Sequence, residues 1–307
     1  MLWRYAFQRL LGAIPTLLVM IFIAFYLIHS APGGPFDTEK AIAPEVRANL
    51  DRLYHLDRPL HEQFLYYLNS VVHGDLGPSF RYRDYSVNDL IGAGFPVSFK
   101  LGAVAMLLAL VIGCSMGMLA ALYHNRFLDY TIQLLTVGGI AVPGFVIAPL
   151  LILLFAISLK WLPAGGWEVG RNSDLVLPII ALALPQIAYI ARLMRGSMID
   201  VLSSTYIRAA RGKGLPTWLI VLRHAFKPAF LPVLSYLGPA SAGIITGSVV
   251  VEQIFGIPGI GRYFVQGAMN RDYTLVLGVV VVYGALVVFA NLIVDLLYAW
   301  LDPKVNY

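Results

Sequence analysis

Few residues in this 307-residue chain have the types and spacing that chemistry requires. The run GCSMG at residues 113–117 matches the G-x-S-x-G pattern, in which a serine acts as a nucleophile. That pattern needs a turn between a strand and a helix, whereas this run lies inside an apolar stretch. Its two glycines have the spacing that lets two membrane helices approach closely. The run therefore predicts helix packing, and hydrolysis by Ser115 is a distant alternative.

The sequence predicts no catalytic residue, metal site or ATP site. His61 begins a run like the H-E-x-x-H zinc pattern, but Leu65 replaces the second histidine. Cys114 is the only cysteine, so this chain alone forms no disulfide and no cysteine-based zinc or iron–sulfur site. The GKG run at 212–214 lacks the Ser or Thr that follows the lysine of a phosphate loop, and GIPGIG at 256–261 follows no strand.

The positions of the charges predict an all-α integral membrane protein. Hydrophobic residues make up 59% of the chain and charged residues only 13%, against about 25% in soluble proteins. Six intervals between successive charged residues are long enough for a membrane helix, which needs about 17–25 residues. The six predicted transmembrane spans are 10–29, 100–123, 131–156, 175–195, 231–251 and 275–298.

The distribution of basic residues predicts the orientation of the spans. Arg and Lys gather in the segment 192–227 and at the N-terminus, so both termini and the loop 196–230 are expected in the cytoplasm. The formal charge of +5 therefore reflects membrane topology, and no binding to nucleic acid is expected.

Three parts of the chain follow from this topology. Residues 1–29 form the cytoplasmic N-terminus and the first span, 30–97 a large outer loop, and 98–307 a core of five spans. The outer loop contains two amphipathic patterns, expected either to lie against the membrane domain or to serve as scaffold. Their apolar residues are Val46, Leu50 and Leu53 in the first, and Leu60, Phe64, Tyr67, Leu68 and Val71 in the second.

The cytoplasmic segment 203–230 has a helix–glycine–helix pattern. Ser203, Ser204 or Thr205 can cap a helix through YIRAAR, and Gly212 or Gly214 can end it. A second helix is predicted from TWLIVLRHAF to Pro228. The small side chains of the first helix would let a partner surface approach, and its basic residues would meet acidic or phosphate-bearing groups. Basic residues beside a span can also serve topology alone, but topology requires no such helix pattern.

At these residues the chain resembles the permease subunits of ATP-binding-cassette importers, whose cytoplasmic loop has the form E-A-A-x-x-x-G. Arg208 stands where the glutamate would be, Ala209 and Ala210 match the alanines, and Gly214 matches the glycine. The departures resemble the peptide-importer branch, with RHAFKPAFLP in place of I-x-L-P. The similarity extends along nearly the whole chain, through RLLGAIPTLL, APGGPF, HGDLGPSFRYRDYSVNDL, GPASAGIITGSVVVEQIFGIPGIG, NRDYTLVL and VDLLYAWLDPK.

The resemblance implies an importer-type permease fold and a set of partners in the inner membrane of a bacterium. The partners are a second homologous permease subunit, two ATP-binding subunits that use ATP and Mg, and an external peptide-binding protein. This chain would bind no cofactor, form half of the pore and transmit ATPase motion through a coupling helix at 205–213. The residues expected to dock the ATPase are Arg208, Ala209, Ala210, Arg211, Gly214 and Leu215.

The translocation path is predicted from polar groups in the fifth span: Ser241, Thr246, Ser248 and, at its outer end, Glu252. Helix packing with local hydrogen bonds is an equal alternative for these residues. Oligopeptides are the expected substrates, with dipeptides, nickel chelates and other peptide-like solutes as alternatives. A stand-alone channel or secondary carrier is disfavoured because the interiors of the spans contain no acidic residue.

Overall fold

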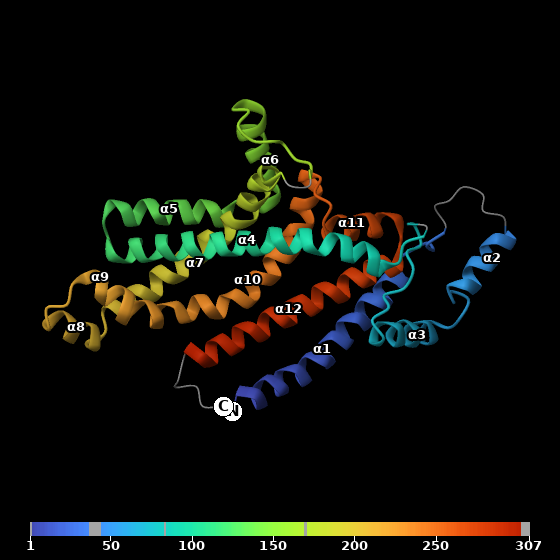
Figure 1. The fold of residues 1–307 in the computed structure, drawn as a ribbon, viewed down its shortest axis with the longest axis horizontal. Coiled ribbons are helices and arrows are strands. Elements are labelled where there is room, and N and C mark those ends of the chain that lie inside the picture. Colours follow the sequence, from blue (N-terminus) through green and yellow to red (C-terminus); the bar gives the residue numbers. More distant parts are fainter. Residues whose placement is uncertain (1, 37–43, 83, 169–170, 302–307) are drawn as a thin grey trace. The chain divides into compact units, whose positions relative to one another are not determined.

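A computed structural model describes residues 2–36, 44–82, 84–168 and 171–301 (Figure 1). Within these ranges the chain forms helices and no strand, apart from one isolated antiparallel bridge between Pro78 and Ser86. In hydrocarbon an α-helix satisfies its own backbone N–H and C=O groups, which an open strand does not. The predicted all-α class is confirmed.

Five helical stretches are long and apolar enough to cross a membrane. They contain α1 (Leu2–Ser30), α4 (Val87–Leu122), α7 (Val176–Leu202), α10 (Phe226–Phe255) and α12 (Tyr273–Leu301). The 3₁₀ turn η2 (Asn172–Leu175) leads into α7. The short helix α9 (Thr217–Leu219) and the π-helix η3 (Ile220–Ala225) lead into α10. The chain is thus a multi-pass membrane protein.

The third predicted span, 131–156, is not one straight helix. It consists of α5 (Phe127–Ala141), then α6 (Gly144–Leu151) and the π-helix η1 (Ile152–Ser158), with a bend of 104° between the two parts. Pro143 precedes α6 in an extended conformation, and Val142 before it is also extended. The residue before a proline avoids the helical region, so the helix breaks here. Counted as one span, the bent pair brings the total in the described residues to six.

The chain divides into two compact units. Unit 1 comprises Met1–Leu10, Phe99–Ile257 and Val287–Tyr307, and unit 2 comprises Leu11–Ser98 and Pro258–Leu286. The boundaries fall inside α1, α4 and α12, so the units do not follow the order of the spans. The division predicted from topology, 1–29, 30–97 and 98–307, stays a prediction.

In unit 1 the helix α7 packs against α5, α6 and α10. Helix α4 also approaches it closely at Gly117, where a Cβ atom would lie 2.5 Å from the Ala191 carbonyl oxygen and 2.7 Å from the Met194 Cβ. Only glycine fits at this distance. The packing interpretation of GCSMG is therefore confirmed, and the Ser115 hydroxyl donates to the Val111 carbonyl oxygen of its own helix.

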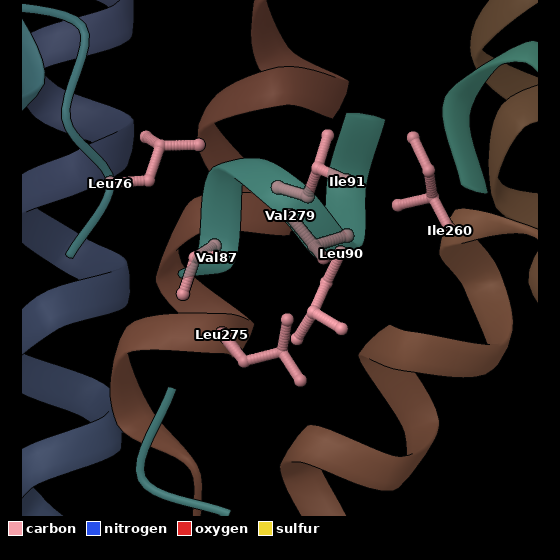
Figure 2. Close-up of a cluster of buried hydrophobic side chains, with 7 residues drawn as sticks. All are labelled: Leu76, Val87, Leu90, Ile91, Ile260, Leu275 and Val279. Carbon is pink, nitrogen blue, oxygen red and sulfur yellow. The ribbon is translucent and has the colours of Figure 1, made fainter. Parts of the chain in front are cut away.

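In unit 2 a hydrophobic cluster joins the segment before α4, the first turns of α4, α11 (Ile260–Asn270) and the start of α12. Its buried members are Leu76, Val87, Leu90, Ile91, Ile260, Leu275 and Val279 (Figure 2). The two helices of the outer loop are α2 (Pro44–Leu53) and α3 (Leu60–Val72). The Phe64 and Tyr67 rings of α3 lie 5.4 and 6.3 Å from the Phe25 ring of α1, so the apolar face of α3 packs on that helix. The side chains of Val46, Leu50 and Leu53 lie outside the described part.

Asp272, which is fully buried, ties the loop before α4 to the start of α12. Its Oδ2 accepts hydrogen bonds from the Ser79 hydroxyl and the Arg81 backbone N–H, and its Oδ1 accepts from Thr274 Oγ1 and the Leu275 N–H. The last of these bonds is an N-cap interaction. One carboxylate thus satisfies donors from two distant segments.

Replacing Asp272 with alanine should destabilise unit 2 markedly. The change removes a helix cap and leaves buried donors unpaired, a loss of about 2–4 kcal/mol in the free energy of unfolding. Asp89→Ala is the matched control, because Asp89 caps α4 with Ser86 at an exposed position and should lower the denaturation midpoint much less. Thermal denaturation of both purified variants in detergent compares them, and equal shifts of the midpoint would contradict the role of Asp272.

Candidate coupling site

The short helix α8 (Thr205–Gly212) is attached to unit 1 through one buried side chain. Ile207 is 0% exposed, and α8 contacts α7 and η3. Ser204 stands at the predicted N-cap position, but its hydroxyl donates to the Val201 carbonyl oxygen and makes no capping bond. The helix is therefore positioned by burial of Ile207 rather than by a cap. Full burial of an isoleucine side chain contributes about 1.5–3 kcal/mol.

The end of α8 is fixed by a glycine turn. Gly214 has φ +75°, a conformation that glycine adopts without steric cost. Its N–H donates to the Arg211 carbonyl oxygen at 2.9 Å, and the Leu215 N–H donates to the Ala210 carbonyl oxygen at 3.4 Å. This pair of bonds is the Schellman motif, which satisfies carbonyl groups at a helix end. The chain direction after α8 is thus set by Gly214, one of the two glycines that the sequence offered for this end.

The structure brings the six predicted docking residues together on α8 and its turn. Arg208, Ala209 and Arg211 are exposed, as is Gly214 in the turn, whereas Ala210 and Leu215 are partly buried. Apart from its two neighbours in the chain, no described residue has an atom within 4 Å of a Cβ placed on Gly214, so this side of the turn is open. A surface docked at this place would meet two guanidinium groups beside a small alanine.

Two exposed aromatic residues beside these six were missed by the sequence reasoning. Tyr206 on α8 is 48% exposed and Trp218 on α9 is 64% exposed. Both extend the open surface with apolar area, which protein interfaces use as anchors. The sequence shows both aromatic residues close to the basic ones. However, an aromatic residue beside a span is equally typical of an anchor at the membrane interface, so the sequence alone does not indicate a docking role.

The predicted end of the second helix at Pro228 is wrong. The chain continues from α9 through the π-helix η3 into α10 without a break, and Pro228 lies in the first turn of α10. Proline lacks the N–H that would bond to a carbonyl oxygen one turn back, and the π-helix η3 directly before α10 is the local irregularity of this helix. The α8 segment is consequently joined to a long membrane helix on each side, α7 before it and η3–α10 after it.

A buried ion pair joins α5 to α7 near the end that leads into α8. Arg195 donates from Nε to Asp129 Oδ1 at 2.6 Å and from its terminal nitrogen to Oδ2 at 2.8 Å. Asp129 is 0% exposed and also accepts from the Asn125 N–H and the Gln133 side chain. Such two-pronged pairs fix geometry as well as adding energy. Arg195, which the sequence assigned to topology, therefore also holds two helices together.

The predicted path residues lie in α10, within unit 1. The hydroxyls of Ser241 and Ser248 donate to carbonyl oxygens one turn back in their own helix, those of Gly238 and Ile245. Ser248 and Glu252 are buried, and Ser241 is partly buried. The side chain of Thr246 lies outside the described part. These local bonds suit the packing alternative, and a role of the four residues in translocation stays a prediction.

The acid near the end of the last span is paired. The carboxylate of Asp295 in α12 forms an ion pair with the guanidinium of Arg9 in α1, with 3.1 Å between Oδ2 and Nε, and both residues belong to unit 1.

Among the described residues no cluster of three or more His, Cys, Asp and Glu side chains has the geometry of a metal site.

Several membrane spans, with an exposed basic helix between two of them, define a multi-pass membrane protein, and comparison with known proteins assigns it to a class of transport components. The family described as "binding-protein-dependent transport system inner membrane component" matches residues 109–307, and its N-terminal counterpart matches residues 1–102. The chain belongs to this family. Proteins of this kind are permease subunits of ABC transporters and not enzymes, because ATP is hydrolysed by separate subunits.

Individual relatives match over their whole length. The chain is 55% identical to the oligopeptide transport system permease protein OppB of Salmonella typhimurium, over 304 residues and 99% of each chain. It is 52% identical to the protein of the same name in Haemophilus influenzae, again over 99% of each chain. The dipeptide transport system permease protein DppB of Bacillus subtilis is 43% identical, over 99% of this chain and 98% of its own.

A β-branched residue at Gly214 should disable the coupling site. Gly214→Val places a Cβ in the left-handed region, at a cost of about 1–2 kcal/mol, and redirects the chain after α8. Gly212→Ala is the matched control, because Gly212 ends the helix without a positive φ and has open space around it. Transport by the assembled system, measured with equal amounts of inserted protein, should be lost in the first variant and kept in the second. Normal transport in Gly214→Val would refute the role of the turn.

Proposed function

We propose that this chain is a permease subunit of an ATP-driven importer of oligopeptides, in the inner membrane of a bacterium. The observation that carries the proposal is the 55% identity over the whole chain to a permease named for oligopeptide transport. The exposed helix α8, anchored at Ile207 and ended at Gly214, supports it as a docking element. Both termini and the segment 196–230 face the cytoplasm in this proposal, because their basic residues favour that side.

The chain acts with four kinds of partner. A second homologous permease subunit completes the pore, two ATP-binding subunits dock on the cytoplasmic side, an external peptide-binding protein delivers the substrate, and the lipid bilayer surrounds the spans. ATP and Mg are used by the ATP-binding subunits. Arg208, Ala209, Ala210, Arg211, Gly214 and Leu215 form the contact with one of these subunits, with Tyr206 and Trp218 at its edge.

The mechanism is alternating access driven through α8. Ile207 is buried against unit 1, two residues separate α8 from α7 before it, and a four-residue turn at 213–216 leads from α8 to α9 and η3–α10. A displacement of α8 by its partner is therefore transmitted to two membrane helices rather than absorbed by a loose loop. ATP favours the state in which the ATPase pair is closed, and the permease equilibrium shifts by the difference in free energy between its states.

Peptides share a uniform backbone, so a permissive path suffices and the binding protein supplies most of the selection. Ser241, Thr246, Ser248 and Glu252 are the first candidates for that path.

Dipeptides are the alternative substrates, since one relative at 43% identity is named for dipeptide transport. Competition by dipeptides and by pentapeptides against uptake of a labelled tripeptide separates the two: the proposal expects the pentapeptides to compete.

The docking proposal is tested by co-purification from native membranes with a mild detergent. Ala209 is exposed on α8, so Ala209→Glu introduces a bulky acid at the expected contact without disturbing buried side chains. The wild-type chain should retain two ATP-binding subunits and a second permease. The variant should lose the ATP-binding subunits and keep the second permease.

The matched control is Ser203→Glu, which adds the same charge at an exposed position just before α8. It should keep all partners. A wild-type chain that purifies alone would contradict the importer proposal and favour a stand-alone channel or carrier. Retention of the ATP-binding subunits by Ala209→Glu would show that α8 is not the contact.

A further inference from the structure

The open positions of α7 form one narrow polar face. Between Leu177 and Leu202 the exposed residues are Tyr189, Arg192, Gly196 and Asp200, each three or four residues after the last. That spacing places them on one side of the helix. None of them is a large aliphatic residue, although the rest of α7 is strongly apolar. Gly196 and Asp200 belong to the segment proposed to face the cytoplasm, so Tyr189 and Arg192 are the exposed residues of α7 within the predicted span. A guanidinium group at such a position does not suit contact with lipid chains.

Helix α10, which packs on α7, has a similar open face. Between Lys227 and Ile245 its exposed residues are Pro232, Ser235, Pro239 and Gly243, again with helical spacing. Small and polar residues on membrane helices face other helices or water rather than lipid.

A polar cluster joins the two helices near the middle of each. Tyr236 of α10 donates from its hydroxyl to Gln186 Oε1 of α7 at 2.9 Å. The Tyr189 ring lies 5.6 Å from the Tyr236 ring, and Tyr189 is 42% exposed. The Tyr189 ring therefore lies at the open face, with the partly buried Tyr236 ring next to it.

Other helices of unit 1 expose a very different surface. On α4 the exposed side chains include Leu107 and Val111, at 63% and 59%, and on α5 they include Leu134 and Leu135, at 74% and 60%. Large aliphatic side chains at mid-span match the hydrocarbon of a bilayer. In unit 1 the exposed side chains of α4 and α5 therefore suit contact with lipid, whereas those of α7 and α10 do not.

We propose that the open faces of α7 and α10 line the water-filled translocation path, and that the side chains of Tyr189 and Tyr236 contact the backbone of a peptide in transit, while the buried Gln186 holds the Tyr236 hydroxyl in place. This inference rests on the proposed function and places the contact on residues outside the set first predicted for α10. Tyrosine hydroxyl groups exchange hydrogen bonds with the N–H and C=O groups that every peptide repeats. The tyrosine rings offer apolar area to side chains of any type. Neither interaction needs a particular sequence.

Cysteine accessibility tests the inference, since the natural cysteine is single and buried. Cys114→Ser gives a cysteine-free parent. Single cysteines then replace Tyr189 and Ser235 on the proposed path, and Leu107 and Leu134 on the proposed lipid surface as controls. Each variant is reconstituted with its partner subunits in liposomes and treated with a membrane-impermeant cationic methanethiosulfonate. Thiolates form and react only where water reaches them, so the first pair should react at least about tenfold faster than the controls.

The binding protein loaded with pentaalanine should slow the reaction at Tyr189→Cys during turnover and leave the controls unchanged. Equal rates at all four positions, or no reaction at Tyr189→Cys and Ser235→Cys, would overturn the inference. Reaction only after removal of the second permease would also overturn it and assign the faces to the subunit interface. Peptide uptake by the cysteine-free parent is measured separately. If uptake fails while Tyr189→Cys and Ser235→Cys still react fast, the proposed substrate is refuted. The conclusion that these faces line a water-filled path then still holds.

Discussion

Close packing on α7 is the constraint on which unit 1 depends. A glycine of α4 meets the backbone of α7 with no space for a side chain, Asp129 of α5 holds Arg195 by two short bonds, and Tyr236 of α10 bonds to Gln186. In a bilayer the hydrophobic effect does not drive helices together, so contacts of this kind must do so. Each contact also leaves α7 little freedom to move alone.

The same constraint supports the proposal that the short helix α8 acts on the whole permease. Helix α8 follows α7 after two residues and is fixed by Ile207 and by the turn at Gly214. Because Arg195 and Asp129 tie α5 to the same end of α7, motion of α8 would carry α5 with it. The π-helix η3 on the other side of α8 is the kind of local irregularity that often marks functional positions in helices.

Features encoded by local spacing were predicted from the sequence, and features that depend on distant partners were not. Charge-free intervals located the spans because a charge in hydrocarbon is costly, and Gly214 ended α8 because its φ favours glycine. The sequence predicted 131–156 as one span, and the 104° bend at Pro143 depends on how the helices on either side of it pack. The Arg195–Asp129 pair and the Tyr236–Gln186 bond join residues far apart in the chain, and a single sequence gives no signal for such pairs. Ser204 shows the opposite error. Serine is a common N-cap residue, so the sequence suggested a capping bond, but the Ser204 hydroxyl donates to the Val201 carbonyl oxygen instead.

The most direct test of coupling through α8 is site-specific photo-crosslinking in intact membranes. A benzophenone amino acid at Ala209, exposed on α8, is compared with one at Leu107, exposed on the apolar surface of α4. The account predicts a crosslink from position 209 to an ATP-binding subunit and none from position 107. A crosslink from position 209 to lipid alone, or to no protein, would contradict the account.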